Sequence, residues 1–95
     1  MMWRAEVRVM LKQSVNDPQG LSIRGALHSL AFAGVQTVRA GKLFQVQLEA
    51  ESRPDAEREV ERMCAQLLAN PVIETYTFSV EEALAGEAVP GRSPG

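Results

Sequence analysis

The sequence predicts an α+β fold with the element order β-α-β(β)-α-β, in which an antiparallel sheet carries both helices on one face. Three observations support this prediction. Apolar and polar residues alternate with the period of a β-strand at residues 3–12, 35–51 and 72–80. Two stretches between them space their apolar residues as a helix does. The composition, with 45% apolar and 23% charged residues, is typical of a soluble globular protein.

The 95 residues are enough for one domain, which we expect to span residues 1–82. Residues 83–95 show no apolar periodicity and are rich in Ala, Gly and Pro, so we expect a disordered tail. A domain of this size has a small core, and assembly with a partner or a second copy would bury more surface.

The first strand, Trp3 to Lys12, is apolar at odd positions and mostly charged at even positions. Side chains of a strand point alternately to its two faces, so one face of this strand is expected to be buried. The apolar face carries Trp3, Ala5, Val7, Val9 and Leu11.

The first helix is predicted to begin at Asp17-Pro18. Aspartate caps helix N-termini, and proline fits the first helical position without the loss of a hydrogen bond. Apolar residues then recur at intervals of three and four, and we expect this stripe to lie on the sheet. Gly34 is expected to end the helix in the left-handed conformation. The stripe consists of Ile23, Ala26, Leu27 and Leu30.

The region Val35 to Glu51 is strand-like but changes phase near Gly41. The apolar face of its second half, counted back by twos, would include Lys42. A hairpin at Gly41 would set Arg39 opposite Lys42, and like charges that face each other across two strands are unfavourable. We therefore predict one long strand with a bulge at Gly41, which turns Lys42 outward.

The second helix has a capping-box spacing at Ser52 to Asp55 and ends at Asn70-Pro71, because a residue before proline avoids the helical conformation. The last strand is predicted at Val72 to Val80, and Glu74 interrupts its apolar face. With both helices on one face, the arrangement is that of the ferredoxin-like split βαβ folds.

The opposite face of the predicted sheet has no cover. Its side chains are polar yet able to pack against a second copy, so we expect self-association into a dimer or tetramer through this face. They are Arg4, Arg8, Lys12, Gln45, Gln47, Thr75 and Thr77.

Charge and hydropathy exclude two classes of partner. The net charge is −2 and no two Lys or Arg residues are adjacent, which argues against nucleic acid. The longest purely apolar run, Leu30 to Ala33, is too short for a membrane span.

The single cysteine, Cys64, allows no intrachain disulfide, so the cytoplasm is the expected location. Charge is uneven, with six cations and two anions in residues 1–48 but four cations and ten anions in residues 49–95.

We predict no catalytic, cofactor or metal site in this chain. A Cys/His nucleophile pair needs both side chains in one cleft, but Cys64 and His28 lie on different helices. Cys64 belongs to the stripe of the second helix that we expect to face the core, and His28 to the outer side of the first helix. The stripe consists of Ala56, Val60, Met63, Cys64, Leu67 and Pro71. The carboxylates of the second helix spread around it, which suits a solvated face rather than a metal site. An acylphosphatase-like enzyme has this size and topology, but the arginine it requires is missing from the loop Gln13 to Gly20.

Two local features are not explained by the core pattern. Arg39 and Lys42 flank Gly41, either as contacts for an acidic partner or as solvated charges beside a structural bulge. The stretch Asn70 to Glu74 is an abrupt helix-to-strand turn, which is either a contact site or a plain helix stop. The residues alone leave both alternatives open.

Four motifs follow one another along residues 2–82. They are Asp17-Pro18-Gln19-Gly20, Ala26-Leu27-His28-Ser29-Leu30, Val35-Gln36-x-Val38-Arg39-x-Gly41-Lys42 and Met63-Cys64-x-x-Leu67-Leu68-Ala69-Asn70-Pro71-Val72-Ile73-Glu74-x-Tyr76. In order and spacing they resemble the PurS family, the small subunits of bacterial and archaeal phosphoribosylformylglycinamidine synthase. The sequence departs from the family at Ala31, where the family prefers glycine, and in a tail that continues past the usual family end.

The resemblance implies a role in de novo purine synthesis. In that family's complex the glutaminase subunit, PurQ, releases ammonia from glutamine, and the synthetase subunit, PurL, uses ATP and Mg²⁺ to activate formylglycinamide ribonucleotide. The PurS-like chain would bridge PurL and PurQ and assist ammonia transfer, with no cofactor of its own. We predict its partner-interface residues to be Asp17, Pro18, Gln19, Gly20, Arg39, Gly41, Lys42, Asn70, Pro71 and Glu74.

Two readings from other classes stay open. A regulatory module of the ACT type shares the predicted topology and self-association, and would bind an amino acid at a dimer interface. A free-standing enzyme of the acylphosphatase kind is the second reading, against which the missing loop arginine already counts.

Overall fold

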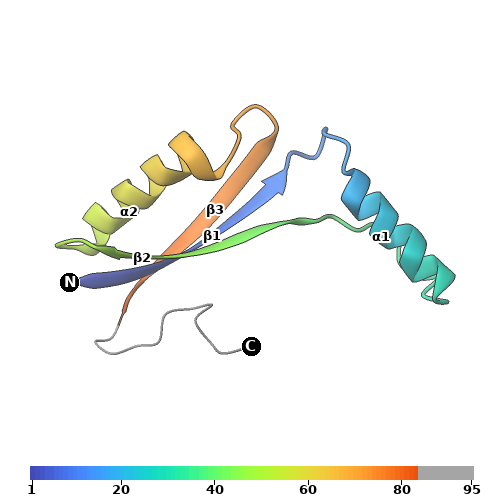
Figure 1. The fold of residues 1–95 in the computed structure, drawn as a ribbon, viewed down its shortest axis with the longest axis horizontal. Helices are drawn as coiled ribbons and strands as arrows, with labels where there is room; N and C mark the ends of the chain where they lie inside the picture. The colour runs from blue at the N-terminus through green and yellow to red at the C-terminus, as the bar shows by residue number, and fades with distance from the viewer. Residues whose placement is uncertain (84–95) are drawn as a thin grey trace.

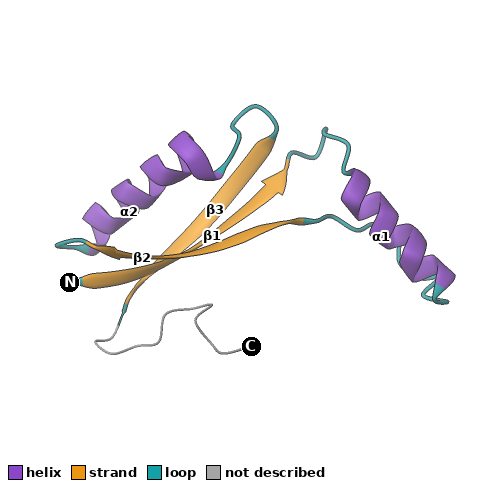
Figure 2. Cartoon of the chain, in the orientation of Figure 1, coloured by secondary structure: helices purple, strands orange, loops and turns teal. Residues whose placement is uncertain are grey.

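The computed structural model of the chain describes residues 1–83, which form an antiparallel sheet and two α-helices (Figures 1 and 2). The strands are β1 (Met2–Leu11), β2 (Gly41–Glu49) and β3 (Glu74–Glu82). They are ordered β2-β1-β3, and β1 is antiparallel to both neighbours. The α+β class and the antiparallel sheet are therefore confirmed.

The described residues end just beyond the predicted domain boundary. Ala83 is buried, and its N–H donates to the carbonyl of Met2 at 2.9 Å. Apart from Ala83, the predicted tail of residues 83–95 lies outside the described residues.

The helix α2 (Arg53–Met63) covers one face of the sheet, above β1 and β3 (Figure 1). Its N-cap is Ser52, whose hydroxyl accepts a hydrogen bond from the N–H of Asp55, as the capping-box spacing predicts. The helix continues into a single π-helical turn, Cys64–Leu68, labelled η1. After this turn the chain leaves the helix at Ala69, one residue before Asn70-Pro71.

The core lies between α2 and the sheet. The apolar face of β1 is buried, and β3 and α2 add residues that pack against it. The alternation of β1 thus predicted its buried face correctly, and the stripe of α2 did so as far as Cys64. Leu67, the next residue of the predicted stripe, is instead 83% exposed, and Leu68 packs against the core, because the wider π-helical turn shifts the repeat by one residue. The buried core side chains are Trp3, Ala5, Val7, Val9, Ala56, Val60, Cys64, Ala69 and Val80.

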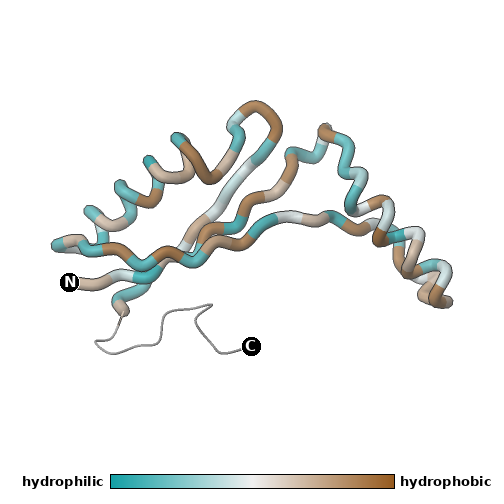
Figure 3. Tube along the Cα trace, viewed as in Figure 1, coloured by the Kyte–Doolittle hydropathy of each residue, from teal (hydrophilic) through white to brown (hydrophobic). Residues whose placement is uncertain are grey.

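The helix α1 (Pro18–Ser29) does not lie on the sheet, and this prediction was wrong. Figure 1 shows α1 projecting beyond the end of the sheet, because the segments on either side of it continue roughly along β1 and β2. We call residues 12–40 the arm. Its predicted stripe is open to solvent, with Ile23 38% and Leu30 68% exposed, and hydrophobic residues are visible along the arm in Figure 3.

The end of α1 also differs from the prediction. The helix stops at Ser29 rather than running to Gly34, and Ala31 takes a φ of 74°, in the left-handed region. A β-carbon in this conformation crowds the following carbonyl, so glycine normally occupies such positions. Ala31, where the sequence lacks the glycine that the family prefers, is therefore the residue at which the backbone turns into the left-handed conformation.

The predicted long strand of residues 35–51 is shorter and has no bulge, and the prediction that Lys42 turns outward was wrong: Lys42 lies opposite Val9, on the same face as Phe44. Pairing with β1 runs without interruption from Gly41, opposite Met10, to Glu49, opposite Met2. Residues 35–40 have no strand to pair with, because β1 ends at Leu11. A β-carbon at Gly41 would lie 2.5 Å from the carbonyl oxygen of Val9, so close packing rather than a bulge accounts for this glycine.

Candidate functional site

Asp17 lies at the arm root, by which we mean residues 17–20 and 38–40, where the two chain segments of the arm meet the end of the sheet. Its carboxylate is buried and accepts two hydrogen bonds at 2.9 Å, from the N–H of Gly20 and from the N–H of Ala40. These N–H groups lower the pKa of Asp17, with Gly20 the larger influence and the nearby Arg39 charge acting in the same direction. Asp17 therefore caps α1 and also ties the helix to the segment that enters β2.

Gly20 and Arg39 close the root from its two sides. A β-carbon on Gly20 would lie 2.2 Å from the carbonyl oxygen of Val38, so only glycine allows the first turn of α1 to approach this segment. The Arg39 guanidinium donates to the carbonyls of Leu11 and Lys12, at 2.7 and 3.0 Å. Through these contacts, both ends of the arm are fixed to the end of β1.

The turn between α2 and β3 is closed by Glu74. The side chain of Glu74 is only 12% exposed; one carboxylate oxygen accepts the N–H of Asn70 at 2.7 Å, and the other lies 3.4 Å from Nζ of Lys42. The Asn70 N–H, together with the Lys42 charge, lowers the pKa of Glu74. Glu74 interrupts the apolar alternation of its strand because its carboxylate is needed at this position. It accepts the N–H of Asn70 in the turn and pairs with the Lys42 side chain on β2.

The two groups of predicted interface residues occupy the same end of the sheet. Glu74 lies opposite Leu11 and Gly41 lies opposite Met10, while the N–H of Lys12 donates to the carbonyl of Ile73 at 2.8 Å. The structure thus brings the arm root and the 70–74 turn together. Pro18, Gln19 and Pro71 are exposed beside them.

The contacts within the chain also bear on the two alternatives that the residues left open. Contacts within the chain are sufficient to explain four of the predicted residues, because each has a structural role described above. These are Asp17, Gly20, Arg39 and Glu74. Lys42, by contrast, is 56% exposed although it pairs with Glu74. A partner contact at these residues remains a prediction.

Arg24 and His28 are two polar residues of the arm that the sequence interpretation did not assign to a site. Nε of Arg24 donates to the carbonyl of Gln36 at 2.8 Å, and Nε2 of His28 lies 2.7 Å from the carbonyl oxygen of Val35. They hold the returning segment of the arm alongside α1. Their spacing of four residues, which places them on one helix face, is the signal that could have revealed this role.

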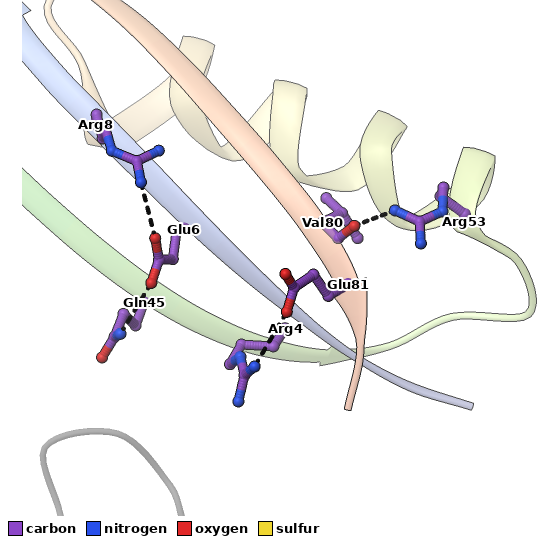
Figure 4. A network of polar contacts seen from close by, with 7 residues as sticks. All are labelled: Arg4, Glu6, Arg8, Gln45, Arg53, Val80 and Glu81. Atoms are coloured by element: carbon purple, nitrogen blue, oxygen red, sulfur yellow. Dashed lines mark hydrogen bonds and ion pairs between the residues drawn. The ribbon is translucent and has the colours of Figure 1, made fainter. Parts of the chain in front are cut away.

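The outer face of the sheet carries a row of polar contacts (Figure 4). Arg4 pairs with Glu81 at 3.1 Å, and Glu6 accepts from both Arg8, at 3.0 Å, and Gln45, at 3.3 Å. Neither described helix covers this face, as the prediction of an uncovered polar face requires.

Cys64 is fully buried, and burial raises the pKa of its thiol, with the charge of Glu61 acting in the same direction. A thiol in this state is a weak nucleophile, so the structure supports a packing role for it. Within residues 1–83, no group of three or more His, Cys, Asp or Glu side chains is placed to hold a metal ion. In the same part of the chain, no helix has the length and hydropathy needed to cross a membrane.

Comparison with known proteins decides the family. The family model of PurS, described as phosphoribosylformylglycinamidine (FGAM) synthase, matches residues 4–82. The chain belongs to the PurS family. It is 46% identical over 84 residues to the PurS subunit of FGAM synthase from Bacillus subtilis, a match that covers 88% of this chain and 99% of that one.

Solved PurS structures have the same fold. The chain is similar to Thermus thermophilus PurS, with a TM-score of 0.80, 35% identity and coverage of 88% of this chain and all of that one. It is also similar to a chain in the structure of PurLQS from Thermotoga maritima, with a TM-score of 0.79, 30% identity and coverage of 85% and 99%. Membership of the PurS family confirms the resemblance noted in the sequence and makes the chain a subunit of a ligase complex. The ACT-like and acylphosphatase-like readings have no support from these matches.

Proposed function

We propose that this PurS chain is the non-catalytic small subunit that bridges the PurQ glutaminase and the PurL synthetase and assists the transfer of ammonia between them. The observation that carries the proposal is the similarity to a chain in the structure of PurLQS from Thermotoga maritima. In this assignment glutamine is used at PurQ, ATP and Mg²⁺ are used at PurL, and this chain binds no cofactor. The complex is expected to work in the cytoplasm.

The shape of the chain supports a bridging role. Its extents are 49 × 35 × 19 Å, and Figure 1 shows the arm at one end of the long direction and α2 at the other. The two ends differ in charge. The arm contains three cations and one anion, whereas residues 49–62, at the end that carries α2, contain six anions and three cations. A molecule with two separated surfaces of different charge suits contact with two different partners.

The interface residues belong to the same proposal. Eight of the ten predicted residues belong to the arm root or to the 70–74 turn, and the other two, Gly41 and Lys42, begin β2. All of them lie at one end of the sheet. We assign this end to a partner subunit. Anchoring of the backbone by Asp17 would present the exposed residues Pro18 and Gln19, and anchoring by Glu74 would present Pro71, without a further ordering cost.

Self-association is a separate part of the proposal. The outer sheet face is uncovered by the described helices, and its polar side chains lie beside exposed Met10 and Leu43, which line a shallow hollow of about 380 Å³. A second copy on this face would bury apolar area that one small domain leaves in water. Light scattering of the purified chain tests this: a dimer or tetramer is expected, and a monomer mass at micromolar concentration would contradict it.

Co-purification tests the bridging role. The tagged chain is expected to retain both PurQ and PurL, whereas PurQ and PurL without it are expected to associate weakly. Equal association of PurQ and PurL with and without the chain would remove the bridging function and leave only the family assignment.

A further inference from the structure

A cavity of about 490 Å³ lies at the root of the arm, between the arm's outgoing segment, α1 and the returning segment. Most of its lining residues are of polar types, and they include two arginines, Arg24 from α1 and Arg39 from the returning segment. Hydroxyl and amide side chains complete it, among them Ser14, Asn16 and Thr37. The volume is within the range of sites that bind small groups or side chains.

Neither arginine forms an ion pair in the described part of the chain, although the charge of Arg39 acts on the Asp17 carboxylate nearby. Among residues 1–83, Arg4, Arg8, Lys42, Arg58 and Arg62 each pair with a carboxylate. Arg24 and Arg39 instead donate their hydrogen bonds only to backbone carbonyls. Asp17, the one carboxylate that lines the cavity, already accepts the N–H groups of Gly20 and Ala40.

Both guanidinium groups are anchored yet retain donors. Arg24 uses Nε for Gln36, and Arg39 uses one terminal nitrogen for Leu11 and Lys12, so their other N–H groups contact no acceptor within residues 1–83. A guanidinium has five N–H donors in a fixed plane, which matches the two oxygens of a carboxylate. Because both groups are half-buried and held in place, an anion would meet them with little loss of side-chain freedom.

A carboxylate fits this cavity better than a phosphate does. Phosphates are commonly bound by free N–H groups at a helix N-terminus. At the N-terminus of α1 these groups are taken, because Gly20 donates to the Asp17 side chain and Leu21 to the Asp17 carbonyl. The cavity therefore offers guanidinium groups but no backbone cradle.

We propose that this cavity receives the carboxylate of an acidic side chain from a partner polypeptide, with Arg24 and Arg39 as its hydrogen-bond donors. The inference rests on the proposed function in taking the ligand to be a partner protein. It changes the predicted interface in two respects: Arg24 joins it as a contact, and Asp17 lines the cavity instead of contacting the partner.

The test follows the Nε–Hε NMR signals of the ¹⁵N-labelled full chain during titration with an acetylated, amidated hexaglutamate peptide. The signals of Arg24 and Arg39 are expected to shift in a saturable manner, and those of Arg58 and Arg62 to stay in place. Arg24→Gln is expected to weaken peptide binding about tenfold, as for loss of a charged contact. The matched control, Arg62→Gln on α2, is expected to leave binding unchanged.

A second variant covers the case in which Arg24→Gln disturbs the arm, since Arg24 also holds Gln36. Thr37→Glu places a carboxylate of the chain itself at the cavity while both arginines are kept, and Thr37 is exposed, so folding should survive. Loss of the peptide response with an unchanged melting temperature is expected.

Three results would overturn the inference: no saturable shift at Arg24 and Arg39, equal shifts at every arginine, or a stronger response to inorganic phosphate at matched ionic strength than to the peptide. The titration needs neither PurL nor PurQ. Failure of the three subunits to assemble would therefore count against the proposed function, whereas failure of the titration counts against the carboxylate site alone.

Discussion

The Asp17 carboxylate and the Ala40 N–H are 2.9 Å apart, although 23 residues separate them in the chain. The same carboxylate caps α1 through Gly20, so one side chain joins the beginning of the arm to its end. The direction in which α1 leaves the sheet is therefore set within the chain. Four predictions test the arm root, the turn at Ala31 and the core.

Gly20→Ala tests the close approach at the arm root. The new methyl group would meet the carbonyl oxygen of Val38 at 2.2 Å, so α1 has to shift, at a cost of about 1–3 kcal/mol in the free energy of unfolding. Gly25→Ala is the matched control, because nothing lies within 4 Å of a β-carbon there. In the helix interior it should stabilise by about 0.5–1 kcal/mol. Urea unfolding measures both, and equal effects would contradict the packing at Val38.

Asp17→Asn tests the hydrogen bonds of the carboxylate through their pH dependence. The folded pKa lies below the ordinary value of 3.8, so the unfolded chain binds the proton more readily. The stabilisation is therefore present above that value and is lost as the pH falls through the lowered folded pKa. The melting temperatures of the wild type and the variant should differ at neutral pH and converge in acid.

The control for Asp17→Asn is Glu57→Gln, at an exposed position on α2. Its melting curve should follow that of the wild type across the whole pH range. A constant difference between the wild type and Asp17→Asn, with no convergence in acid, would mean that the charge of Asp17 contributes nothing to stability.

Ala31→Gly should stabilise the chain. Ala31 has a φ of 74°, and relief of this strain outweighs the greater freedom of glycine in the unfolded chain, for a gain of about 0.5–1 kcal/mol. Ala33→Gly in the same loop, where φ is not positive, should instead destabilise by about 0.5 kcal/mol. A loss of stability in Ala31→Gly would show that the left-handed turn is not populated.

Cys64→Ala should cost on the order of 1 kcal/mol of stability, because a fully buried side chain is shortened against Val60 and β1. The native thiol should react slowly with a disulfide reagent, since it is buried and its pKa is raised. Turnover of the assembled complex should be nearly unchanged. Loss of turnover with a normal melting temperature would assign the thiol a functional role.

The sequence predicted the buried faces because they follow from local periodicity. The alternation from Trp3 to Leu11 and the stripe from Ala56 to Cys64 each fit one face of a strand or helix, and both faces are buried. The candidate interface residues came from breaks in this periodicity near Gly41 and Glu74 and from motif resemblance, whereas their gathering at one end of the sheet is a finding of the structure.

The position of α1 could not be predicted from its apolar stripe. The spacing of Ile23, Leu27 and Leu30 indicates a helix with one apolar side, but it does not show what that side packs against. Residues 35–40 were assigned to a strand for a similar reason: their pattern suits one, yet a strand needs a neighbour, and β1 ends at Leu11. The contacts that decide both cases, at Asp17 and Arg39, join residues far apart in the chain.

Turnover of the reconstituted enzyme tests the central claim most directly. PurL and PurQ are assayed for FGAM formation with glutamine and, separately, with ammonia, in the presence and absence of this chain. The account predicts that the chain strongly stimulates glutamine-dependent turnover and changes ammonia-dependent turnover much less. Equal glutamine-dependent turnover with and without the chain would contradict its role as the subunit that links the two.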